Sequence, residues 1–346
     1  MRERRHEADF SPPRGLTNAH VQTLLPRLLP RPPLAREVEV LELPDGDFVE
    51  LNWASPQPAD PEAPVFVLFH GLEGSFDSPY ARWLLSAASR LGWRAVLMHF
   101  RGCGSQPNRL PRAYHSGDTA DAYWLFGQLT HRFPKALKVA AGVSLGGNML
   151  LKLVAEQGGD GLDLAGAIVI SAPLDLAASA DRLNQGVSRI YERHLLSALK
   201  RKVRDKLVHG ALPLPLDAGG LDSLSSLRAY DDVVTAPLHG FEGAEDYYQR
   251  ASAGPLLGDV ELPTLILHAD DDPFMPASLY ERLPAPSPAV HLEIARHGGH
   301  VGFMEWRNRR LEPWLARRIS RELASWSSPA IPWTGRAGPH LTRSGS

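Results

Sequence analysis

The chain has 346 residues with 37 basic and 39 acidic side chains, which gives a formal charge of −2. This length suits one large α/β domain or two modest ones, and the near-neutral charge argues against a nucleic-acid-binding surface. Hydrophobic residues make up 43% and charged residues 22% of the chain, as in globular proteins, so extensive disorder is excluded.

The single cysteine, Cys103, excludes an internal disulfide and a cysteine-built zinc site, and it favours a reducing compartment. No apolar stretch approaches the roughly 18 residues that a transmembrane helix needs. The charged segment from Met1 to His6 has no apolar region behind it and does not resemble a secretory signal. We therefore expect a cytoplasmic protein.

The two ends of the chain differ in composition from the middle. Residues 1–36 are rich in Arg and Pro, and we expect them to form an N-terminal arm. Residues 327–346 carry Pro, Gly, Ser and Thr with little to bury, which predicts a flexible C-terminal tail. The main domain is then expected over residues 37–326.

Short apolar runs alternate with helical patterns along this domain. The first two runs, 38–43 and 48–53, flank the turn sequence Pro44-Asp-Gly-Asp47 and predict a hairpin. A strand that is buried on both faces of a sheet must be apolar at every position. Six further runs are continuously apolar, at 65–69, 95–99, 138–142, 167–170, 264–268 and 290–294. The pattern predicts an α/β fold with an eight-stranded, mostly parallel sheet and helices on both faces.

Two of the intervening helices have clear sequence signals. Ser78 and Pro79 can start one helix, and Gly92 can end it. A second apolar stripe at helical spacing is formed by Trp314, Leu315, Ile319 and Leu323.

Residues 172–262 lie between the sixth and seventh predicted strands and are too many for one crossover helix. We expect a helical lid there rather than a second small domain. It contains an apolar stripe at helical spacing, formed by Leu195, Leu196, Leu199, Val203 and Leu207. The stripe is surrounded by the basic residues Lys200, Arg201, Lys202, Arg204 and Lys206. A basic amphipathic helix can lie on anionic lipid, but such charge runs usually mark a solvated surface, so membrane contact through this helix is possible but not favoured.

The motif Gly142-Val-Ser144-Leu-Gly146 lies between a predicted strand and a predicted helix. A serine on such a tight turn has a strained backbone, and glycine two residues to either side avoids a collision with larger side chains. The positive end of the following helix points at the same place. We therefore expect Ser144 to be a nucleophile, rather than part of a run of small residues that only packs the strand on the helix.

A nucleophilic serine needs a base, and the base needs an orienting carboxylate. Asp270, Asp271 and Asp272 directly follow the predicted strand 264–268. Asp272 is the favoured acid because Asp272-Pro-Phe-Met-Pro276 has the acid-x-x-x-Pro form common after this strand. Asp271 is kept as the reserve, and Asp270 is expected to cap the turn.

Two histidines, His297 and His300, follow the last predicted strand. His300 is the favoured base, because Gly298 and Gly299 before it allow a loop to bring the imidazole over the edge of the sheet. His297 could equally be a solvated loop histidine.

Hydrolysis of an acyl bond also needs N–H donors for the tetrahedral oxyanion. The backbone N–H of Leu145 is one candidate, and the N–H of Leu72, in the loop after the third strand, is the other. Glu73 beside it would oppose a developing negative charge, so we expect its side chain to point elsewhere. His70 is expected to hold this loop by hydrogen bonds rather than to act as a base.

Two other sites are disfavoured. Cys103 lacks the elbow geometry of a nucleophile. The cluster His268-Ala-Asp-Asp-Asp272 does not suggest a metal site, because carboxylate ligands usually converge from several segments. We expect neither a metal nor an organic cofactor.

The sequence resembles the YheT-like branch of the α/β-hydrolases over most of its length. The likeness lies in the strings Asn18-Ala-His-Val-Gln-Thr-Leu-Leu-Pro26, His70-Gly-Leu-Glu-Gly-Ser75, Met98-His-Phe-Arg-Gly-Cys103, Asn108-Arg-Leu-Pro-Arg-Ala-Tyr-His115, Ser144-Leu-Gly-Gly-Asn148, Thr235-Ala-Pro-Leu-His-Gly-Phe241, Asp271-Asp-Pro-Phe-Met275 and Gly299-His-Val-Gly-Phe303. The resemblance implies an eight-stranded hydrolase sheet, an insertion after the sixth strand, and a triad of Ser144, Asp272 and His300. Members of this branch and its relatives are associated with esterase or lipase activity and, in some cases, with acyl transfer to alcohols.

The expectation is therefore a serine carboxylester hydrolase that cleaves small-molecule acyl esters, short- to medium-chain or lipid-like, with no nucleic-acid partner. Its oligomeric state stays open. One alternative is an acyltransferase on the same triad, with an acyl-CoA or ester donor and an alcohol in place of water. The other is a non-catalytic ligand-binding protein with the same fold, against which the intact triad argues.

Overall fold

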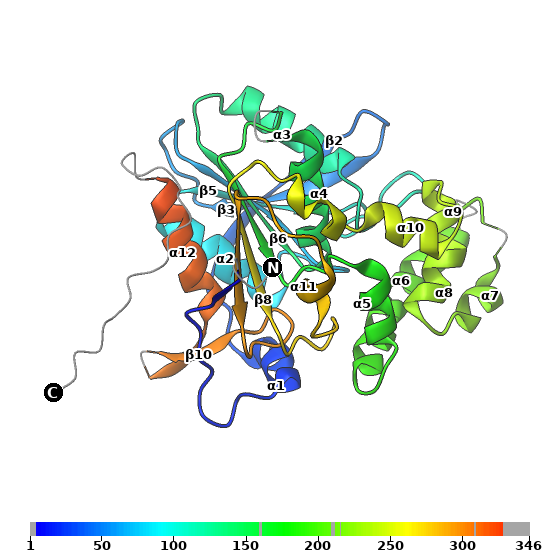
Figure 1. The fold of residues 1–346 in the computed structure, drawn as a ribbon. Coiled ribbons are helices and arrows are strands. Elements are labelled where there is room, and N and C mark those ends of the chain that lie inside the picture. Colours follow the sequence, from blue (N-terminus) through cyan, green and yellow to red (C-terminus); the bar gives the residue numbers. More distant parts are fainter. Residues whose placement is uncertain (1–4, 159–160, 209–211, 215, 308, 328–346) are drawn as a thin grey trace.

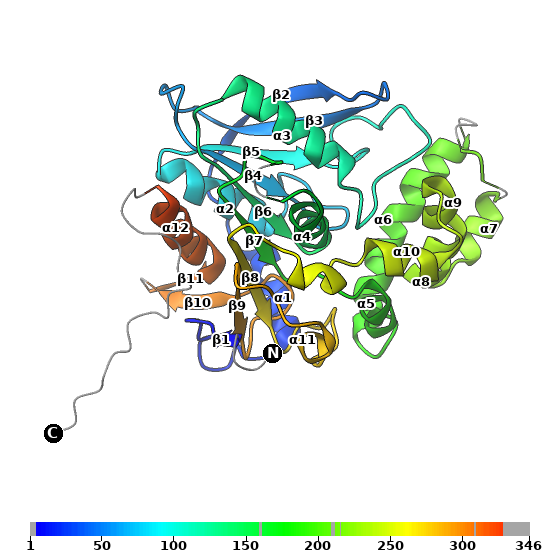
Figure 2. The ribbon, with the colours of Figure 1, turned by 45° about the horizontal axis from the view of Figure 1, so that its top comes forward.

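The computed structural model describes residues 5–158, 161–208, 212–214, 216–307 and 309–327. Within these residues nine strands form one sheet in the order β1-β9-β8-β7-β6-β4-β5-β3-β2 (Figures 1 and 2). The strands are β1 (Arg5–Glu7), β2 (Ala35–Glu42), β3 (Phe48–Ser55), β4 (Val65–Phe69), β5 (Arg94–His99), β6 (Lys138–Val143), β7 (Gly166–Ile170), β8 (Thr264–Ala269) and β9 (Val290–Ala295). The pairs β2–β3 and β3–β5 are antiparallel, and the others are parallel.

The α/β fold is confirmed, and each of the eight predicted strands is present. The strand count was wrong by one, because β1 of the arm pairs in parallel with β9, with Arg5 opposite Leu292. The three polar residues of β1 have no apolar pattern from which a strand could be predicted. In this count the insertion follows the seventh strand, β7, rather than the sixth. A separate hairpin of β10 (Met304–Arg307) and β11 (Arg310–Pro313) was not predicted either.

Helices cover both faces of the sheet because the central strands are apolar on both sides. On one face, α2 (Pro79–Arg90) and α12 (Trp314–Trp326) pack Leu84, Leu85 and Ile319 into one apolar core. On the other face, α3 (Ala120–Arg132) and α4 (Leu145–Gln157) pack against a second core (Figure 2). The helix α2 starts after Ser78 and ends before Gly92, which takes a left-handed φ of +79°.

The insertion between β7 and β8 is helical and lies to one side of the sheet (Figure 1). It comprises α5 (Leu176–Leu183), α6 (Ser188–Val208), α7 (Ala218–Ser223), α8 (Leu227–Tyr230), a π-helical turn (Asp231–Thr235), α9 (Ala236–His239), α10 (Ala244–Ala251) and a 3-10 turn (Gly254–Gly258). Leu196, Val203 and Leu221 belong to a small apolar core of its own. The short helix α11 (Leu279–Arg282) follows β8.

The N-terminal arm packs against the domain through α1 (Ala19–Leu24) and the 3-10 turn η2 (Leu25–Leu28). Gln22 is fully buried. Its Oε1 accepts a hydrogen bond from the Met304 N–H at 2.7 Å, and its Nε2 donates to the Leu16 carbonyl at 2.7 Å. The bond to Met304 attaches the arm to the segment after β9, and the bond to Leu16 lies within the arm.

Most of the predicted C-terminal tail, residues 328–346, lies outside the described residues. None of the helices in the described ranges is long and apolar enough to span a membrane.

A buried ion-pair network fastens α12 to the sheet. Arg318 forms hydrogen bonds of 2.7 and 2.9 Å with the two carboxylate oxygens of Glu293 on β9, and one of 2.6 Å with Glu322. Burial pushes the pKa of Glu293 upward, but the hydrogen bonds and charges of His291 and Arg318 outweigh it and lower this pKa to about 2.

The network predicts a specific loss of stability in acid. A depressed carboxyl pKa stabilises the fold above its unfolded value and loses this effect as the pH falls through the folded value. Glu293→Gln should therefore cost about 3 kcal/mol of unfolding free energy at neutral pH, because it leaves Arg318 buried without its main partner. This difference should shrink as the pH falls from about 4.5 to about 2. Chemical denaturation at several pH values measures it.

The control is Glu62→Gln, which removes an exposed ion pair with Lys135 and should cost less than about 0.5 kcal/mol. A pH-independent difference between the wild type and Glu293→Gln would contradict the prediction.

Candidate active site

Ser144 lies on the turn between β6 and α4 with a left-handed φ of +53°. A Cβ on Gly142 would lie 2.2 Å from the Gly146 carbonyl oxygen, and one on Gly146 would lie 2.5 Å from the His70 carbonyl oxygen. Any side chain at either position would collide with the backbone, so both residues must be glycine. Because of this strained turn, the Ser144 hydroxyl stands above the end of the strand.

The structure brings Ser144, His300 and Asp272 together, although they come from three separate segments. Ser144 Oγ lies 3.0 Å from His300 Nε2, and His300 Nδ1 lies 2.9 Å from Asp272 Oδ2. Since a carboxylate can only accept, the imidazole proton is on Nδ1, and Nε2 is free to accept the serine proton. The second oxygen of Asp272 accepts a hydrogen bond from the Phe274 N–H at 2.8 Å.

The two neighbouring aspartates are used differently. Burial tends to raise the pKa of Asp272, but the charge and hydrogen bond of His300 outweigh it, so the pKa lies below its ordinary value. Asp271, the reserve acid, instead accepts the Gly299 N–H at 2.9 Å and lies 3.3 Å from His297 Nδ1. Burial raises the pKa of Asp271. In this geometry Asp272 holds the His300 imidazole, and Asp271 with His297 supports the loop.

Two aromatic residues that sequence reasoning missed hold the His300 ring in place. The Phe274 ring stacks on the imidazole with centroids 3.9 Å apart and planes 6° apart. Tyr191, from the lid helix α6, packs against Phe274 with ring centroids 5.1 Å apart. The ring of His300 can therefore turn little without disturbing the lid.

The N-terminal arm also fixes the His300 loop. The Thr23 hydroxyl of α1 accepts the His300 N–H at 2.9 Å. A Cβ on Gly299, at φ +58°, would lie 2.4 Å from the Ala19 carbonyl oxygen, and Val301 has a φ of +61°. The strained backbone of Val301 persists because α1 packs directly on the loop. The string Asn18–Pro26 contributes to the family resemblance, but its residue types carry no sign of this role.

The predicted oxyanion donors lie on both sides of Ser144. Leu145 is the first residue of α4, so its N–H has no acceptor within the helix. The N–H groups beside Leu72 are occupied, since Gly71 donates to the Tyr80 hydroxyl and Glu73 to the Tyr114 hydroxyl, both at 2.8 Å. Within the described ranges no protein acceptor is found for the Leu72 N–H. A Cβ on Gly71 would lie 3.1 Å from Ser144 Cβ, so the loop approaches the serine closely.

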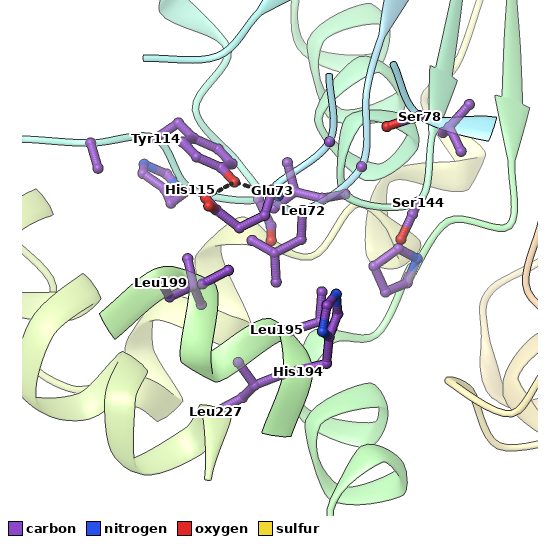
Figure 3. Close-up of a pocket in the computed structure, with 18 of the residues that line it drawn as sticks. Leu72, Glu73, Ser78, Tyr114, His115, Ser144, His194, Leu195, Leu199 and Leu227 are labelled. Carbon is purple, nitrogen blue, oxygen red and sulfur yellow. Dashed lines mark hydrogen bonds between the residues drawn. The ribbon is translucent and has the colours of Figure 1, made fainter. Parts of the chain in front are cut away.

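Glu73 points away from the serine, as expected. Its Oε1 accepts a hydrogen bond from the Tyr114 hydroxyl at 2.9 Å (Figure 3). It accepts another from Lys202 Nζ at 2.8 Å. Burial would lower the pKa of Lys202, but Cys103 and Glu73 raise it, so the ammonium stays charged. Lys202 was expected on the solvated face of the lid helix; instead it turns inward and neutralises Glu73. Lys206 also turns inward, to Asn108 Oδ1 at 2.6 Å.

His70 and Cys103 are not placed for catalysis. His70 is fully buried, its Nδ1 bonds the Gly71 carbonyl at 2.7 Å, and its Nε2 accepts the Phe100 N–H at 3.1 Å. Burial lowers its pKa to about 3, so it is a neutral brace for the loop. Burial raises the pKa of Cys103 to about 11, which leaves almost no thiolate at neutral pH.

A cavity of about 810 Å³ opens beside Ser144 and His300 (Figure 3). One wall is the loop with Leu72, and the opposite wall is the lid. Its apolar lining residues include Leu72, Leu145, Leu176, Leu195, Leu199, Leu227, Val234, Phe274 and Met275. The volume is that of a pocket for a small organic molecule.

Among the described residues, one group of side chains could hold a metal ion. The ligand atoms of His115, Asp118 and His239 lie within 4.8 Å of one another. Asp118 already pairs with Arg112 at 2.7 Å, and His115 Nδ1 accepts the Gly117 N–H at 3.2 Å. Metal binding would have to break these contacts.

Comparison with known proteins supports the resemblance seen in the sequence. The family described as the alpha/beta hydrolase fold matches residues 64–305. The chain is 44% identical over 320 residues to "Putative esterase YheT" of Escherichia coli (strain K12), covering 92% of this chain and 94% of that protein. It is 27% identical to "Phospholipase ABHD3" of Homo sapiens, covering 82% of this chain and 71% of that protein. The esterase Pf2001 of Pyrococcus furiosus shares the fold, with a TM-score of 0.53 and 14% identity over 85% of this chain and 94% of that chain.

The packing of α1 on the His300 loop predicts a difference between two glycines with similar backbones. Gly299→Ala places a methyl group against Ala19 and Thr23, so it should cost about 1 kcal/mol for the left-handed φ and a further ~1–3 kcal/mol for overpacking. Gly240→Ala, at φ +73° with nothing within 4 Å, should cost only the first amount. Unfolding free energies measured by denaturant titration test this. Equal losses in the two variants would contradict the role given to α1.

Proposed function

The chain belongs to the α/β-hydrolase family, in its YheT-like branch, and from this membership and the site we propose that it is a serine carboxylester hydrolase acting on lipid-like acyl esters. The observation that carries the proposal is the 3.0 Å contact between Ser144 Oγ and His300 Nε2 at the wall of an apolar cavity.

The first half of the reaction forms an acyl-enzyme. The Ser144 oxygen attacks the ester carbonyl while His300 Nε2 takes the hydroxyl proton. Asp272 stabilises the imidazolium that forms, and the N–H groups of Leu72 and Leu145 hydrogen-bond the oxyanion. When the tetrahedral intermediate collapses, the C–O bond to the alcohol breaks and His300 gives its proton to the leaving oxygen.

The second half regenerates the serine. His300 removes a proton from a water molecule, and the resulting hydroxide attacks the acyl carbonyl. The bond to Ser144 then breaks, Ser144 regains its proton from His300, and a carboxylic acid leaves. Apart from the ester and water, each step uses only groups that the chain supplies.

The size and lining of the cavity support a substrate with a long acyl chain. About 810 Å³ of space lined by leucines from the lid and the core favours an apolar chain over a polar group. The name of the human relative, a phospholipase, agrees with a lipid ester.

The nucleophile assignment predicts a large and selective loss of turnover. Ser144→Ala should lower kcat/KM for p-nitrophenyl esters by at least about 10³-fold, because it removes the nucleophile. The thermal midpoint should not change, because only one oxygen atom is lost. Ser179→Ala is the matched control. Ser179 also lines the cavity, its hydroxyl donates to the Asp175 carbonyl at 2.8 Å, and the turnover of this variant should stay near the wild-type value. Retained activity in Ser144→Ala would refute the assignment.

The ion pair between the lid and the oxyanion loop predicts a second effect. Lys202→Met leaves the Glu73 carboxylate uncompensated beside the developing negative charge, so kcat/KM should fall about 10- to 100-fold. Lys202→Arg should retain most of the activity. Lys200 lies on the same helix, and its ammonium donates only to the Asp222 carbonyl. The kcat/KM of Lys200→Met should therefore stay within about twofold of the wild-type value. Steady-state kinetics of the three variants decide it, and equal effects at positions 200 and 202 would contradict it.

A further inference from the structure

Large apolar side chains are exposed on one side of the cavity entrance. They come from two segments, the arm helix α1 with η2 and the turn from α5 into α6. The exposed fractions are 80% for Leu28, 64% for Ile190, 54% for Val187, 45% for Leu24 and 39% for Val21. Monomeric proteins seldom gather so many exposed apolar side chains without a binding role.

The two segments lie next to each other. His20 Nδ1 on α1 is 3.0 Å from the Tyr191 hydroxyl on α6, and the two rings stack at 5.8 Å. In Figure 1, α1 and the turn from α5 into α6 both lie at the bottom of the view. Leu24, Arg27 and His194 are exposed and line the cavity, so this face borders an opening of the cavity.

The same side of the molecule carries uncompensated positive charge. Four arginines there are exposed and form no ion pair with another described residue: Arg27, Arg31, Arg189 and Arg193. The nearby acidic groups are already engaged. Asp181 pairs with Arg228 at 3.0 Å, and the buried Glu192 accepts the Leu227 N–H.

We propose that this face, the entrance rim, docks on an anionic lipid surface. The entrance rim is defined by Val21, Leu24, Leu28, Val187 and Ile190 with Arg27, Arg31, Arg189 and Arg193. Apolar side chains can enter the boundary between headgroups and acyl chains, and arginines beside them bind anionic headgroups. The docked enzyme could draw an acyl ester from the lipid into the cavity without exposing the acyl chain to water. This benefit rests on the proposed function, whereas the docking itself does not.

The charge on the entrance rim favours lipid over a second copy of the chain. In a two-fold symmetric dimer the same face meets itself, so the arginines of both copies would be brought together. Like charges in a poorly hydrated interface repel each other. The basic residues around the apolar stripe of α6 do not form the docking surface, because Lys202 and Lys206 are turned inward. The docking surface includes the start of the same helix, with Ile190.

Vesicle co-sedimentation of the full chain tests the proposal. Sucrose-loaded vesicles of equal parts phosphatidylglycerol and phosphatidylcholine are compared with vesicles of phosphatidylcholine alone. The wild type should partition at least about tenfold more strongly onto the anionic vesicles, and Leu28→Ser with Ile190→Ser should remove most of this binding. Arg189→Glu with Arg193→Glu should weaken it by roughly fivefold per arginine, and added salt should weaken it as well.

The matched control is Val38→Ser with Val40→Ser on the exposed face of β2, where these side chains are 53% and 54% exposed. This variant should bind vesicles like the wild type. None of the substituted residues lines the cavity, so turnover of a water-soluble short-chain ester should not change in any variant.

Three results would overturn the proposal: wild-type binding no stronger than that of the entrance-rim variants, equal loss in the β2 control, or a dimer in ultracentrifugation that the Leu28/Ile190 variant abolishes. Docking is measured in Ser144→Ala as well, where it should persist. The two proposals can therefore fail separately, since lost ester turnover with intact vesicle binding counts only against the proposed function.

Discussion

The site depends on one short contact, in which His300 Nε2 lies 3.0 Å from a serine hydroxyl on a strained turn. The serine turn needs support because its backbone conformation is unfavourable alone, and the imidazole must be held in place beside it. Gly142 and Gly146 make the serine turn possible. The imidazole is fixed from three directions, by Asp272 at its Nδ1, by Phe274 on its face and by Thr23 at its backbone N–H. The arm, through Thr23, and the segment after β8, through Asp272 and Phe274, therefore both contribute to one hydrogen bond.

The lid has a second connection to the site through charge. Glu73 follows Leu72, the proposed oxyanion donor, and its carboxylate would oppose an oxyanion if it faced the cavity. It instead binds Lys202 of α6 and Tyr114, so a residue of the lid compensates a charge of the loop. The start of α6 also carries Tyr191, which packs on Phe274. One helix thus contacts the supports of both the base and the oxyanion loop, and any movement of the lid would reach both.

The parts that could be predicted from the sequence are those with a local signal. The central strands are continuous apolar runs, and Ser144, Asp272 and His300 each follow one of them in the order that a hydrolase sheet requires. The strand β1 could not be predicted, because Arg5–Glu7 has no apolar pattern and depends on pairing with β9. Thr23 and Lys202 were missed because their partners are 277 and 129 residues away, and no spacing in the sequence indicates such contacts. For Lys202 the basic run indicated the opposite, a solvated position.

Covalent labelling with a fluorophosphonate, read by peptide mass spectrometry, tests the central claim most directly, because the probe reacts only with an activated serine oxygen. The account predicts one adduct per chain, located on the peptide that contains Ser144, and a much slower reaction in Asp272→Asn, in which the imidazole loses its charged partner. An unlabelled wild-type chain, or an adduct on a different serine, would contradict it.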